Sequence, residues 1–248
     1  VKFAREFMIL DIDVGNSFIK WRLSGVLGVA QRGSQSTPSV VEEGLDLSIS
    51  GPLTQARLSS VASGSVTEIL RQQLKGAFGV QLQKAVVSKA AGGVHCGYPD
   101  CTALGVDRWL AMVGAYSKFS GPLIVVDLGS AITLDIVDKD GQHLGGYILP
   151  GLSLMRESLH RGTVQVRAGV PMDQTITPAI NTSTAVNRGS LLAAVATIEK
   201  LAEMHQSKLI LTGGDAELVT SMLNIQAEHV PELVLDGLSV DDISLVKC

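Results

Sequence analysis

The chain opens with short apolar runs separated by turn residues. Phe7–Val14 is apolar apart from Asp11 and Asp13, Phe18–Leu23 alternates apolar and polar residues, and Val26–Gln31 follows a Ser-Gly turn. Runs of this length and period, bounded by turn residues, predict β-strands. We therefore expect three short strands joined by tight turns at the start of the chain.

The apolar pattern changes between residues 44 and 122. Val66–Leu74 has apolar residues at helical spacing, Ala85–Ser88 has the composition of a short buried strand, and Gly105–Tyr116 has the pattern of a helix that follows a loop. The sequence Ser120-Gly121-Pro122 then interrupts any regular structure. A helix, a strand and a second helix are predicted for this region.

After that interruption the opening pattern returns. Leu123–Ser130 repeats the run that ends in the first turn, with Asp127 matching Asp13 and Gly129 matching Gly15 at a constant offset of 114 residues. A second apolar strand, an Asp-Gly turn and a third strand follow, as they do in the first copy. A repeat spacing near half the chain length indicates two homologous lobes rather than an array of small repeats.

The rest of the second half continues the alternation of helices and strands. Leu152–His160 and Ala185–His205 are predicted helices, and Lys208–Thr212 is a predicted buried strand. Strands mixed with helices in both halves indicate the α/β class. We predict two duplicated lobes, residues 8–119 and 120–248, with a cleft between them, and interpret residues 1–7 as an N-terminal extension or a remnant of cloning.

Composition narrows the class of protein. The 248 residues are 46% hydrophobic and 18% charged, with a formal charge of −4 and a mean hydropathy of +0.29, so a large buried core is possible and whole-chain disorder is excluded. The most apolar stretch, Pro122–Val137, is interrupted by two aspartates and a threonine, so no membrane span is expected. Scattered cations and a pI near 5.7 also argue against a nucleic-acid partner.

The cysteines point to a reducing compartment. Cys96, Cys101 and Cys248 are too few, and odd in number, for a disulfide framework, and no secretory signal opens the chain, so a cytoplasmic location is expected. Cys96 and Cys101 lie beside His95, but zinc usually needs four ligands in tighter pairs. A structural metal is therefore not the favoured interpretation of this cluster.

The first acidic turn has the residues of a phosphate-binding loop. It is formed by Asp13-Val14-Gly15-Asn16-Ser17-Phe18-Ile19-Lys20, in which a carboxylate ends a strand, a glycine turn exposes backbone amides and a lysine supplies a cation. Asp13 is a candidate ligand for Mg²⁺ that is bound through phosphate oxygens. An ordinary hairpin turn would use the same residues. The second copy, Asp127-Leu128-Gly129-Ser130, favours the functional interpretation.

A third segment combines an acid and an arginine at the start of a predicted helix. In Gly105-Val106-Asp107-Arg108, the aspartate lies near the positive end of the helix dipole, and the arginine offers a planar fork for a substrate carboxylate. A capping aspartate followed by a surface arginine is the structural alternative. This segment alone does not decide between the two interpretations.

Taken in order, these segments resemble the type III pantothenate kinases, a branch of the acetate and sugar kinase/Hsp70/actin superfamily with an actin-like (ribonuclease H-like) fold. The family's opening DxGNS/T turn, GxDR segment, second DxGT-like turn and GGxIxPG loop match Asp13–Ser17, Gly105–Arg108, Asp127–Ser130 and Gly145–Gly151 here. The resemblance covers Met8 to about Leu235. Ser130 differs from the threonine of many members but keeps the hydroxyl.

The resemblance implies transfer of the ATP γ-phosphate to pantothenate, the first step of coenzyme A synthesis. By position, Asp13–Lys20 and Ser130 resemble ATP-binding residues, and Asp107 resembles the general base. Tyr98, Gly105, Val106, Asp107 and Arg108 resemble the pantothenate pocket, to which Thr182 of a dimer partner is added. Asp127 resembles the ligand of a monovalent cation, K⁺ or ammonium.

The resemblance also implies that ATP binds with Mg²⁺. It further implies a homodimer whose subunits share the pantothenate site. Leu211–Ala216 also resembles the superfamily's TGG turn near adenosine, although a turn at the start of a helix explains it equally well. Two rival functions stay open: a superfamily kinase for another small alcohol, and a non-catalytic accessory factor for transcription.

Overall fold

A computed structural model describes residues 7–49, 51–61, 64–162 and 174–248. The chain forms two compact units: Val1–Lys118 together with Leu233–Cys248, and Phe119–Glu232. All but the last residue of the predicted extension at residues 1–7 lies outside the described residues. The sequence placed residues 120–248 in the second lobe, and the structure differs, because the final segment returns to the first unit.

The first unit is built on a mixed sheet with the strand order β13-β5-β4-β1-β2-β3. β1 pairs antiparallel with β2 and parallel with β4, so it lies in the middle of the sheet. The strands are β1 (Met8–Val14), β2 (Phe18–Gly25), β3 (Gly28–Ser36), β4 (Leu53–Ser60), β5 (Leu82–Ala85) and β13 (Leu245–Lys247). A hairpin, β6 (Ala90–Ala91) and β7 (Val94–His95), and a 3₁₀ turn, η1 (Cys101–Ala103), complete its irregular part.

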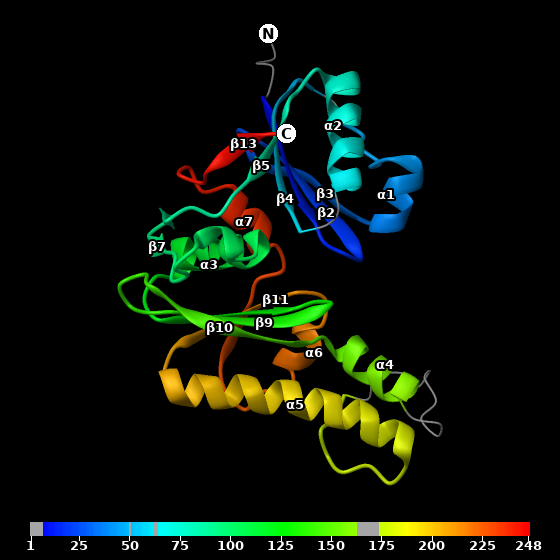
Figure 1. Ribbon diagram of the computed structural model, residues 1–248, viewed down its shortest axis with the longest axis vertical. Helices are drawn as coiled ribbons and strands as arrows, with labels where there is room; N and C mark the ends of the chain where they lie inside the picture. Colours follow the sequence, from blue (N-terminus) through cyan, green and yellow to red (C-terminus); the bar gives the residue numbers. More distant parts are fainter. Residues whose placement is uncertain (1–6, 50, 62–63, 163–173) are drawn as a thin grey trace. The chain divides into compact units, whose positions relative to one another are not determined.

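Helices cover both faces of this first sheet. On one face, α1 (Thr37–Glu43) and α2 (Gly64–Phe78) bury an apolar core in which Val66, Leu70 and Leu74 of α2 recur every fourth residue. On the other face, α7 (Leu233–Leu238) packs against β1 and β4 (Figure 1). The alternation of side chains along β1 therefore separates an apolar face from a charged one.

The helix α3 (Val106–Phe119) packs against α7 at a close crossing of two backbones. A Cβ atom on Gly114 would lie 2.5 Å from the Leu233 carbonyl oxygen, and one on Gly237 would collide with the Leu110 carbonyl oxygen. Two glycines allow this approach because they carry no side chain. Since α7 also lies on β1 and β4, it connects the helix that begins at the GxDR segment to the central sheet.

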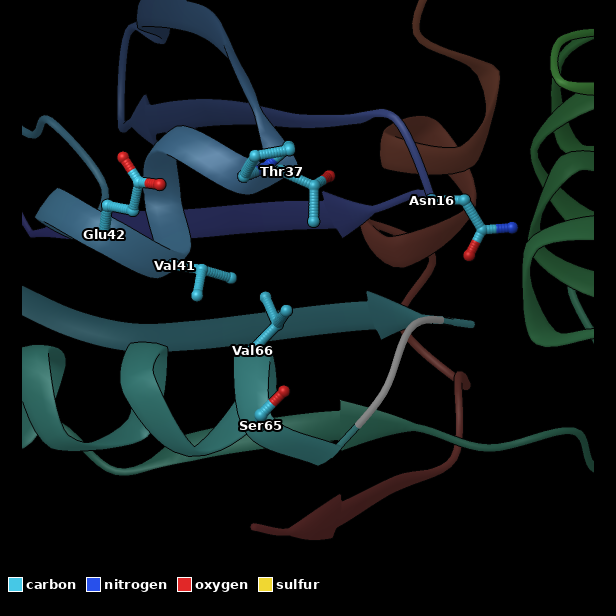
Figure 2. Close-up of a pocket in the computed structure, with 7 residues that line it drawn as sticks. Asn16, Thr37, Val41, Glu42, Ser65 and Val66 are labelled. Atoms are coloured by element: carbon cyan, nitrogen blue, oxygen red, sulfur yellow. The ribbon is translucent and has the colours of Figure 1, made fainter.

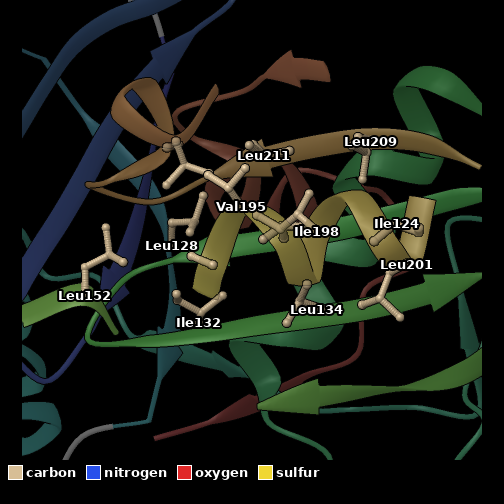
Figure 3. Packing of buried hydrophobic residues seen from close by; sticks show 14 of the residues in the cluster. Ile124, Leu128, Ile132, Leu134, Leu152, Val195, Ile198, Leu201, Leu209 and Leu211 are labelled. Atoms are coloured by element: carbon tan, nitrogen blue, oxygen red, sulfur yellow. The ribbon is translucent and has the colours of Figure 1, made fainter. Parts of the chain in front are cut away.

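The second unit has the strand order β10-β9-β8-β11-β12. Its helices α4 (Leu152–Gly162) and α5 (Thr182–His205) contact each other, and α5 buries Val195, Ile198 and Leu201 against the sheet (Figures 1 and 3). The remaining elements are β8 (Leu123–Leu128), β9 (Ala131–Val137), β10 (His143–Pro150), β11 (Lys208–Thr212), β12 (Ala227–His229) and α6 (Ala216–Thr220).

The two sheets repeat one topology. In each, the first strand of a three-stranded meander pairs antiparallel with the second strand and parallel with a later strand, as β1 does with β2 and β4, and β8 with β9 and β11. Asp13 lies opposite Lys20, whereas Asp127 lies opposite Thr133, so the second turn is one residue shorter. The predicted α/β class and the internal duplication are confirmed, and the constant offset ends at the turn.

Several predicted boundaries differ from the structure. The strand predicted at Ala85–Ser88 is β5, Leu82–Ala85, whose two end residues are both buried, and the strand ends there because the Val86 amide donates to the Ser244 carbonyl rather than to β4. The third strand begins at Gly28, since Val26 and Leu27 form an exposed turn. In the described residues, no helix combines the length and apolarity needed to cross a membrane.

Candidate functional site

The first acidic turn is held rigidly by the start of α1. The Gly15 amide donates to the Phe18 carbonyl at 3.0 Å, the Thr37 amide donates to the Ser17 carbonyl at 3.0 Å, and the Thr37 hydroxyl donates to the Gly15 carbonyl at 3.0 Å. Thr37 itself is buried, whereas Asn16 and Ser17 are exposed. The turn therefore presents short polar side chains on a fixed backbone, as a phosphate cradle requires.

Charged and polar side chains flank this turn in the sheet. Lys20 on β2 and Ser59 on β4 are the register partners of Asp13, one on each side. Asp13 and Lys20 are partly exposed, and Ser59 is fully buried. The three side chains project on the same face because cross-strand partners share a face.

A cavity of about 420 Å³ adjoins the turn between α1 and α2. Figure 2 shows Asn16 at the turn after β1, Thr37, Val41 and Glu42 on α1, and Ser65 and Val66 at the start of α2. Its wall mixes apolar side chains with hydroxyl, amide and carboxylate groups. The cavity extends the polar surface of the turn along the first unit.

The GxDR segment forms the first turn of α3. The Trp109 amide donates to the Gly105 carbonyl at 3.0 Å, and the Asp107 carboxylate accepts from the Arg108 amide at 2.8 Å. A Cβ atom on Gly105 would lie 2.6 Å from the Asp107 carboxylate, so glycine leaves room for the acid. Asp107 is partly exposed in the first turn of α3.

Arg108 and Tyr98 form a pair beside Asp107. The Arg108 guanidinium donates to the Tyr98 hydroxyl at 3.2 Å and lies 5.9 Å from the centre of the tyrosine ring. Arg108 is only 8% exposed, so the surface arginine offered by the structural alternative is excluded. A cation held by a ring and by a hydroxyl has a fixed direction, which suits the binding of a carboxylate.

The second acidic turn is enclosed by two glycines from elsewhere in the second unit. The Gly151 amide donates to the Ser130 carbonyl at 3.1 Å, and a Cβ atom on Gly151 would collide with the Gly129 carbonyl oxygen. A Cβ atom on Gly213, which has a φ of +97°, would lie 2.5 Å from the Asp127 carboxylate. The backbone thus surrounds Asp127 closely, and Ser130 stays exposed.

The TGG turn, Leu211–Ala216, packs against the second acidic turn. Thr212 is the register partner of Asp127, and the Asp215 amide donates to the Leu128 carbonyl at 3.1 Å. Partial burial raises the pKa of the Asp215 carboxyl, and the charge of Arg156 offsets part of this rise. The alternative explanation of Leu211–Ala216, a simple turn at the start of a helix, does not account for the close approach of Gly213 to Asp127.

The structure divides the predicted residues between the units. Asp13–Lys20, Tyr98 and Gly105–Arg108 lie in the first unit, and Asp127, Ser130 and Thr182 lie in the second. Within the first unit, Tyr98, Asp107 and Arg108 are brought together at the start of α3. Thr182 is the exposed first residue of α5, after the capping residue Asn181, whose side chain accepts from the Thr184 amide at 2.9 Å.

Three residues shape the turns in ways that were not predicted: Thr37 lay outside every motif, and Gly151 and Gly213 stood in the GGxIxPG loop and the TGG turn without an assigned role. Thr37, Gly151 and Gly213 act through contacts with residues that are far away in the chain. Thr37 and Gly151 occupy matching places, each directly after the third strand of a meander, so the internal repeat was the signal that could have found them. The TGG pattern was the signal for Gly213.

The donor set suits a metal that is bound through a ligand's phosphates. In the described residues, no group of three or more histidine, cysteine, aspartate or glutamate side chains could hold a metal ion by itself. A lone carboxylate such as Asp13 fits Mg²⁺, which usually binds one or two carboxylates and completes its shell with phosphate oxygens and water. The Asp127 carboxylate, enclosed by backbone, is a candidate for a monovalent cation.

The chain is similar over nearly its whole length to proteins of one family. Residues 9–204 match the family model described as type III pantothenate kinase. A type III pantothenate kinase of Ectopseudomonas mendocina is 40% identical over 94% of this chain and 98% of its own length. One from Chromohalobacter salexigens is 39% identical over 93% of this chain and 86% of its own length.

Solved structures give the fold. A candidate Baf family transcriptional activator from Campylobacter jejuni superposes with a TM-score of 0.60 at 21% identity, covering 92% of this chain and 94% of that one. A candidate 2-dehydro-3-deoxygalactonokinase from Sinorhizobium meliloti gives 0.55 at 14% identity, covering 93% and 97%. With the repeated sheet topology, these likenesses confirm the predicted actin-like fold class.

Proposed function

The chain belongs to the type III pantothenate kinase family, and from this premise we propose how its residues perform the family's reaction. The protein transfers phosphate from ATP to pantothenate, the first step of coenzyme A biosynthesis. The observation that carries this conclusion is the match to the family over nearly the whole chain. The assignment of roles to individual residues is our proposal, and it rests on the geometry of the two turns and of the GxDR segment.

Asp107 is proposed to receive the proton of the pantothenate hydroxyl. Its carboxylate is partly exposed at the first turn of α3, and Gly105 leaves the space that it occupies. An aspartate is a weak base toward an alcohol at neutral pH, so it orients the hydroxyl first and accepts the proton late, as the bond to phosphorus forms. Val106 and Gly105 provide backbone around the acceptor.

Arg108 and Tyr98 are proposed to bind the pantothenate carboxylate and the chain next to it. The guanidinium is buried and already fixed by the tyrosine hydroxyl at 3.2 Å, so little side-chain entropy is lost when the substrate binds. A substrate anchored there would present its far hydroxyl at a defined position. Positioning of this kind supplies much of the rate in phosphoryl transfer.

The two acidic turns are proposed to bind ATP. The side-chain amide of Asn16 and the hydroxyl of Ser17, with the Lys20 cation, would contact phosphate oxygens beside the Gly15 backbone, and Ser130 would contribute from the second unit. Asp13 would hold Mg²⁺ through the nucleotide, and Asp127 would bind K⁺ or ammonium. These ions supply positive charge that offsets the charge on the transferring phosphoryl group.

A homodimer is proposed to complete the pantothenate site. Exposed apolar side chains gather on α4, on α5 and on the segment before α5, namely Leu154, Leu159, Ile180 and Leu192. Exposed apolar side chains of this kind often mark a protein–protein interface, and a second copy of the chain would bury them. Thr182, exposed at the start of α5, would then reach the neighbouring subunit's substrate.

Replacing the proposed base tests this assignment. Asp107→Asn keeps the shape of the side chain but removes its charge, so we expect a folded protein whose kcat falls by a factor on the order of 10². The matched control is Asp140→Asn, which changes an aspartate on an exposed turn of the second unit. Transfer of labelled phosphate to pantothenate measures both. A folded Asp107→Asn protein with near-normal kcat would remove Asp107 from this role.

The same assay separates the rival functions. A panel of small alcohols that includes pantothenate would reveal a kinase with a different acceptor, because the preferred acceptor would give the highest kcat/KM. An accessory factor for transcription would transfer no phosphate to any of them. The Asp107 carboxylate beside the Arg108–Tyr98 pair favours the kinase, since binding alone does not require a carboxylate at that position.

A further inference from the structure

A serine hydroxyl is buried beside the first acidic turn. Ser59 lies near the end of β4 and is the register partner of Asp13 on β1. Its side chain is fully buried, and its hydroxyl forms no hydrogen bond with any residue that the structure describes. A buried hydroxyl without a partner costs stability, and an alanine would avoid that cost. The serine at this position therefore needs an explanation other than packing.

Asp13 is within reach of this hydroxyl. Two residues earlier on the same face of the same two strands, Arg57 donates two hydrogen bonds to its register partner Asp11, at 2.6 and 2.9 Å. Neighbouring strands lie about 4.8 Å apart, so a hydroxyl and a carboxylate on register partners can bond when they turn toward each other. For Ser59 this needs only a rotation between staggered positions of a small side chain.

The second unit places a hydroxyl side chain in the same position. Asp127, the counterpart of Asp13, is the register partner of Thr212 on the parallel strand β11, and Thr212 is also buried. In both units, a buried hydroxyl residue is thus paired with the aspartate of an acidic turn. These two aspartates are the ones proposed to bind cations. The recurrence links the buried hydroxyl to the task of the aspartate rather than to one strand.

We propose that the Ser59 hydroxyl positions Asp13 for the Mg²⁺ of the nucleotide by donating a hydrogen bond to the Asp13 carboxylate. This inference rests on the proposed function, because it uses the assignment of Asp13 to the Mg²⁺ that accompanies ATP. Carboxylates that bind metals are themselves hydrogen-bonded, which fixes their direction and increases metal affinity. Because Ser59 is fully buried, it acts through Asp13 and does not touch the nucleotide.

Ser60 provides a matched control on the opposite face of β4. It is 5% exposed, and its hydroxyl also has no hydrogen-bond partner within the described part of the chain. Its register partner is Val14, which belongs to the apolar core under α1 and α2. Ser59→Ala and Ser60→Ala each remove one unpartnered hydroxyl from the same strand. We therefore expect both variants to fold and to keep or raise the melting temperature of the protein without nucleotide.

The test measures how each variant responds to Mg²⁺. For Ser59→Ala we expect about a tenfold rise in the free Mg²⁺ concentration that gives half-maximal phosphate transfer, with an unchanged KM for pantothenate. Ser60→Ala should match the wild type in both values. Binding is followed without turnover, as the rise in melting temperature caused by an ATP analogue in which nitrogen replaces the β,γ-bridging oxygen. With Mg²⁺ this rise should be smaller in Ser59→Ala than in the other two proteins, and with EDTA all three should agree.

A double variant shows whether Ser59 acts through Asp13. Asp13→Asn removes the charge that holds the cation. Adding Ser59→Ala to it should change the Mg²⁺ dependence by less than about twofold, because the group that Ser59 positions is already lost. Effects that multiply in the double variant would overturn the proposal.

The remaining outcomes distinguish this inference from the proposed function. If the melting temperature of the wild type does not respond to Mg²⁺ with the analogue, the proposed function fails and the inference fails with it. If the wild type responds and Ser59→Ala responds equally, only the role of Ser59 is overturned. A Ser59→Ala protein that melts at a lower temperature without nucleotide, and whose KM values for ATP and pantothenate rise alike, would show that the serine is structural and would also overturn the proposal.

Discussion

Thr37 and Gly151, the residues directly after β3 and β10, hold the two acidic turns in different ways. In the first unit, the added hydroxyl of Thr37 donates to the Gly15 carbonyl at 3.0 Å. In the second unit, the missing side chain of Gly151 allows the backbone to lie against the Gly129 and Ser130 carbonyl oxygens. In both copies the residue after the third strand holds the acidic turn, by a hydrogen bond in the first copy and by close backbone packing in the second.

Gly151→Ala tests the close approach. Its Cβ would collide with backbone atoms of the second turn, which cannot move aside as a flexible side chain can. We expect a loss of about 2 kcal/mol in the free energy of unfolding, and a several-fold rise in the KM for ATP because Ser130 shifts. Urea denaturation and steady-state kinetics measure the two effects.

Gly76→Ala is the matched control for that prediction. Gly76 lies on the exposed side of α2, where an added Cβ meets no atom within 4 Å, so alanine should raise stability by about 0.5 kcal/mol. Equal effects of the two substitutions would show that the second turn tolerates a side chain. The role of Gly151 in the site would then be lost.

The raised pKa of Asp215 predicts that the stability of the folded protein depends on pH. Burial raises the pKa of its carboxyl in the folded protein, so the folded state binds more protons than the unfolded state and stability falls as the pH rises through the shifted range. Asp215→Asn should match the wild type below the ordinary pKa of 3.8 and exceed its melting temperature above the raised value. Thermal unfolding without nucleotide, measured from pH 3 to pH 7, follows the difference.

Glu68→Gln provides the comparison of opposite sign. Hydrogen bonds from Arg71 and Gln72 lower the pKa of Glu68 to about 2, so its contribution to stability is present above 4.5 and is lost as the pH falls toward 2. This variant should therefore be less stable than the wild type at neutral pH and approach it in acid. At neutral pH, a melting temperature below the wild type for Asp215→Asn would contradict the first assignment, and one above the wild type for Glu68→Gln would contradict the second.

The residues that could be predicted from sequence are those whose side chains carry chemistry. Asp13, Asp107 and Arg108 stand in recognisable local patterns: an acidic turn that recurs in the second half of the chain, and an acid–arginine pair within a family motif. Thr37 carries no such pattern, and the TGG pattern around Gly213 does not by itself link this glycine to Asp127. Their roles exist only after the chain folds and brings Gly15 and Asp127 beside them.

At the scale of elements, the short helix α7 connects the two parts of the first unit's site. It packs on β1 and β4, which lead to the first acidic turn, and α3 crosses it where Gly114 meets Gly237. Periodicity could not reveal α7, because a helix of six residues shows less than two turns of pattern. Long elements such as α5 and the meander strands were predicted, since each repeats its period several times.

A buried ionic network attaches α7 to the sheet. Fully buried Asp11 on β1 accepts two hydrogen bonds from Arg57 on β4, at 2.6 and 2.9 Å, and one from Ser239 after α7, at 3.1 Å. Arg22 on β2 donates to Asp236 on α7 at 2.6 Å. The charges come from elements far apart in the sequence, so the network was not predictable from local patterns.

Arg57→Met tests the strength of this network. It leaves the Asp11 carboxylate buried without its two-pronged partner, so we expect a loss of about 3 kcal/mol in the free energy of unfolding, measured in urea. Arg161→Met is the control, since Arg161 pairs with Glu157 on the exposed face of α4 and should cost about 0.5 kcal/mol or less. Similar losses in the two variants would mean that the buried pair contributes no more than a surface one.

At the scale of the molecule, the first unit is discontinuous in sequence. The chain leaves it after Lys118, builds the whole second unit and returns at Leu233. The repeat predicted two lobes and a boundary near residue 119, which agrees with the first crossing. It could not predict the second crossing, because the returning segment has no counterpart in the other copy and follows the second unit without a break in composition.

Truncation tests how much the first unit depends on the returning segment. A chain that ends at Glu232 loses α7 and β13, and with them the Leu233, Leu235 and Leu238 side chains that are buried in the full chain. Asp11 also loses Ser239, and Arg22 loses Asp236, so buried charges are left with fewer partners. We expect the first unit to unfold at a much lower temperature and to be digested first by protease.

A chain that ends at Ser244 is the control, because it removes only β13 and Cys248 and keeps α7 together with the bond from the Val86 amide to the Ser244 carbonyl. An edge strand of three residues contributes little, so its melting temperature should stay close to that of the full chain. Mass spectrometry of the protease fragments identifies which unit is protected. If both truncated chains melt with the full-length protein, α7 cannot be what joins the helix of Asp107 to the strands of the first acidic turn.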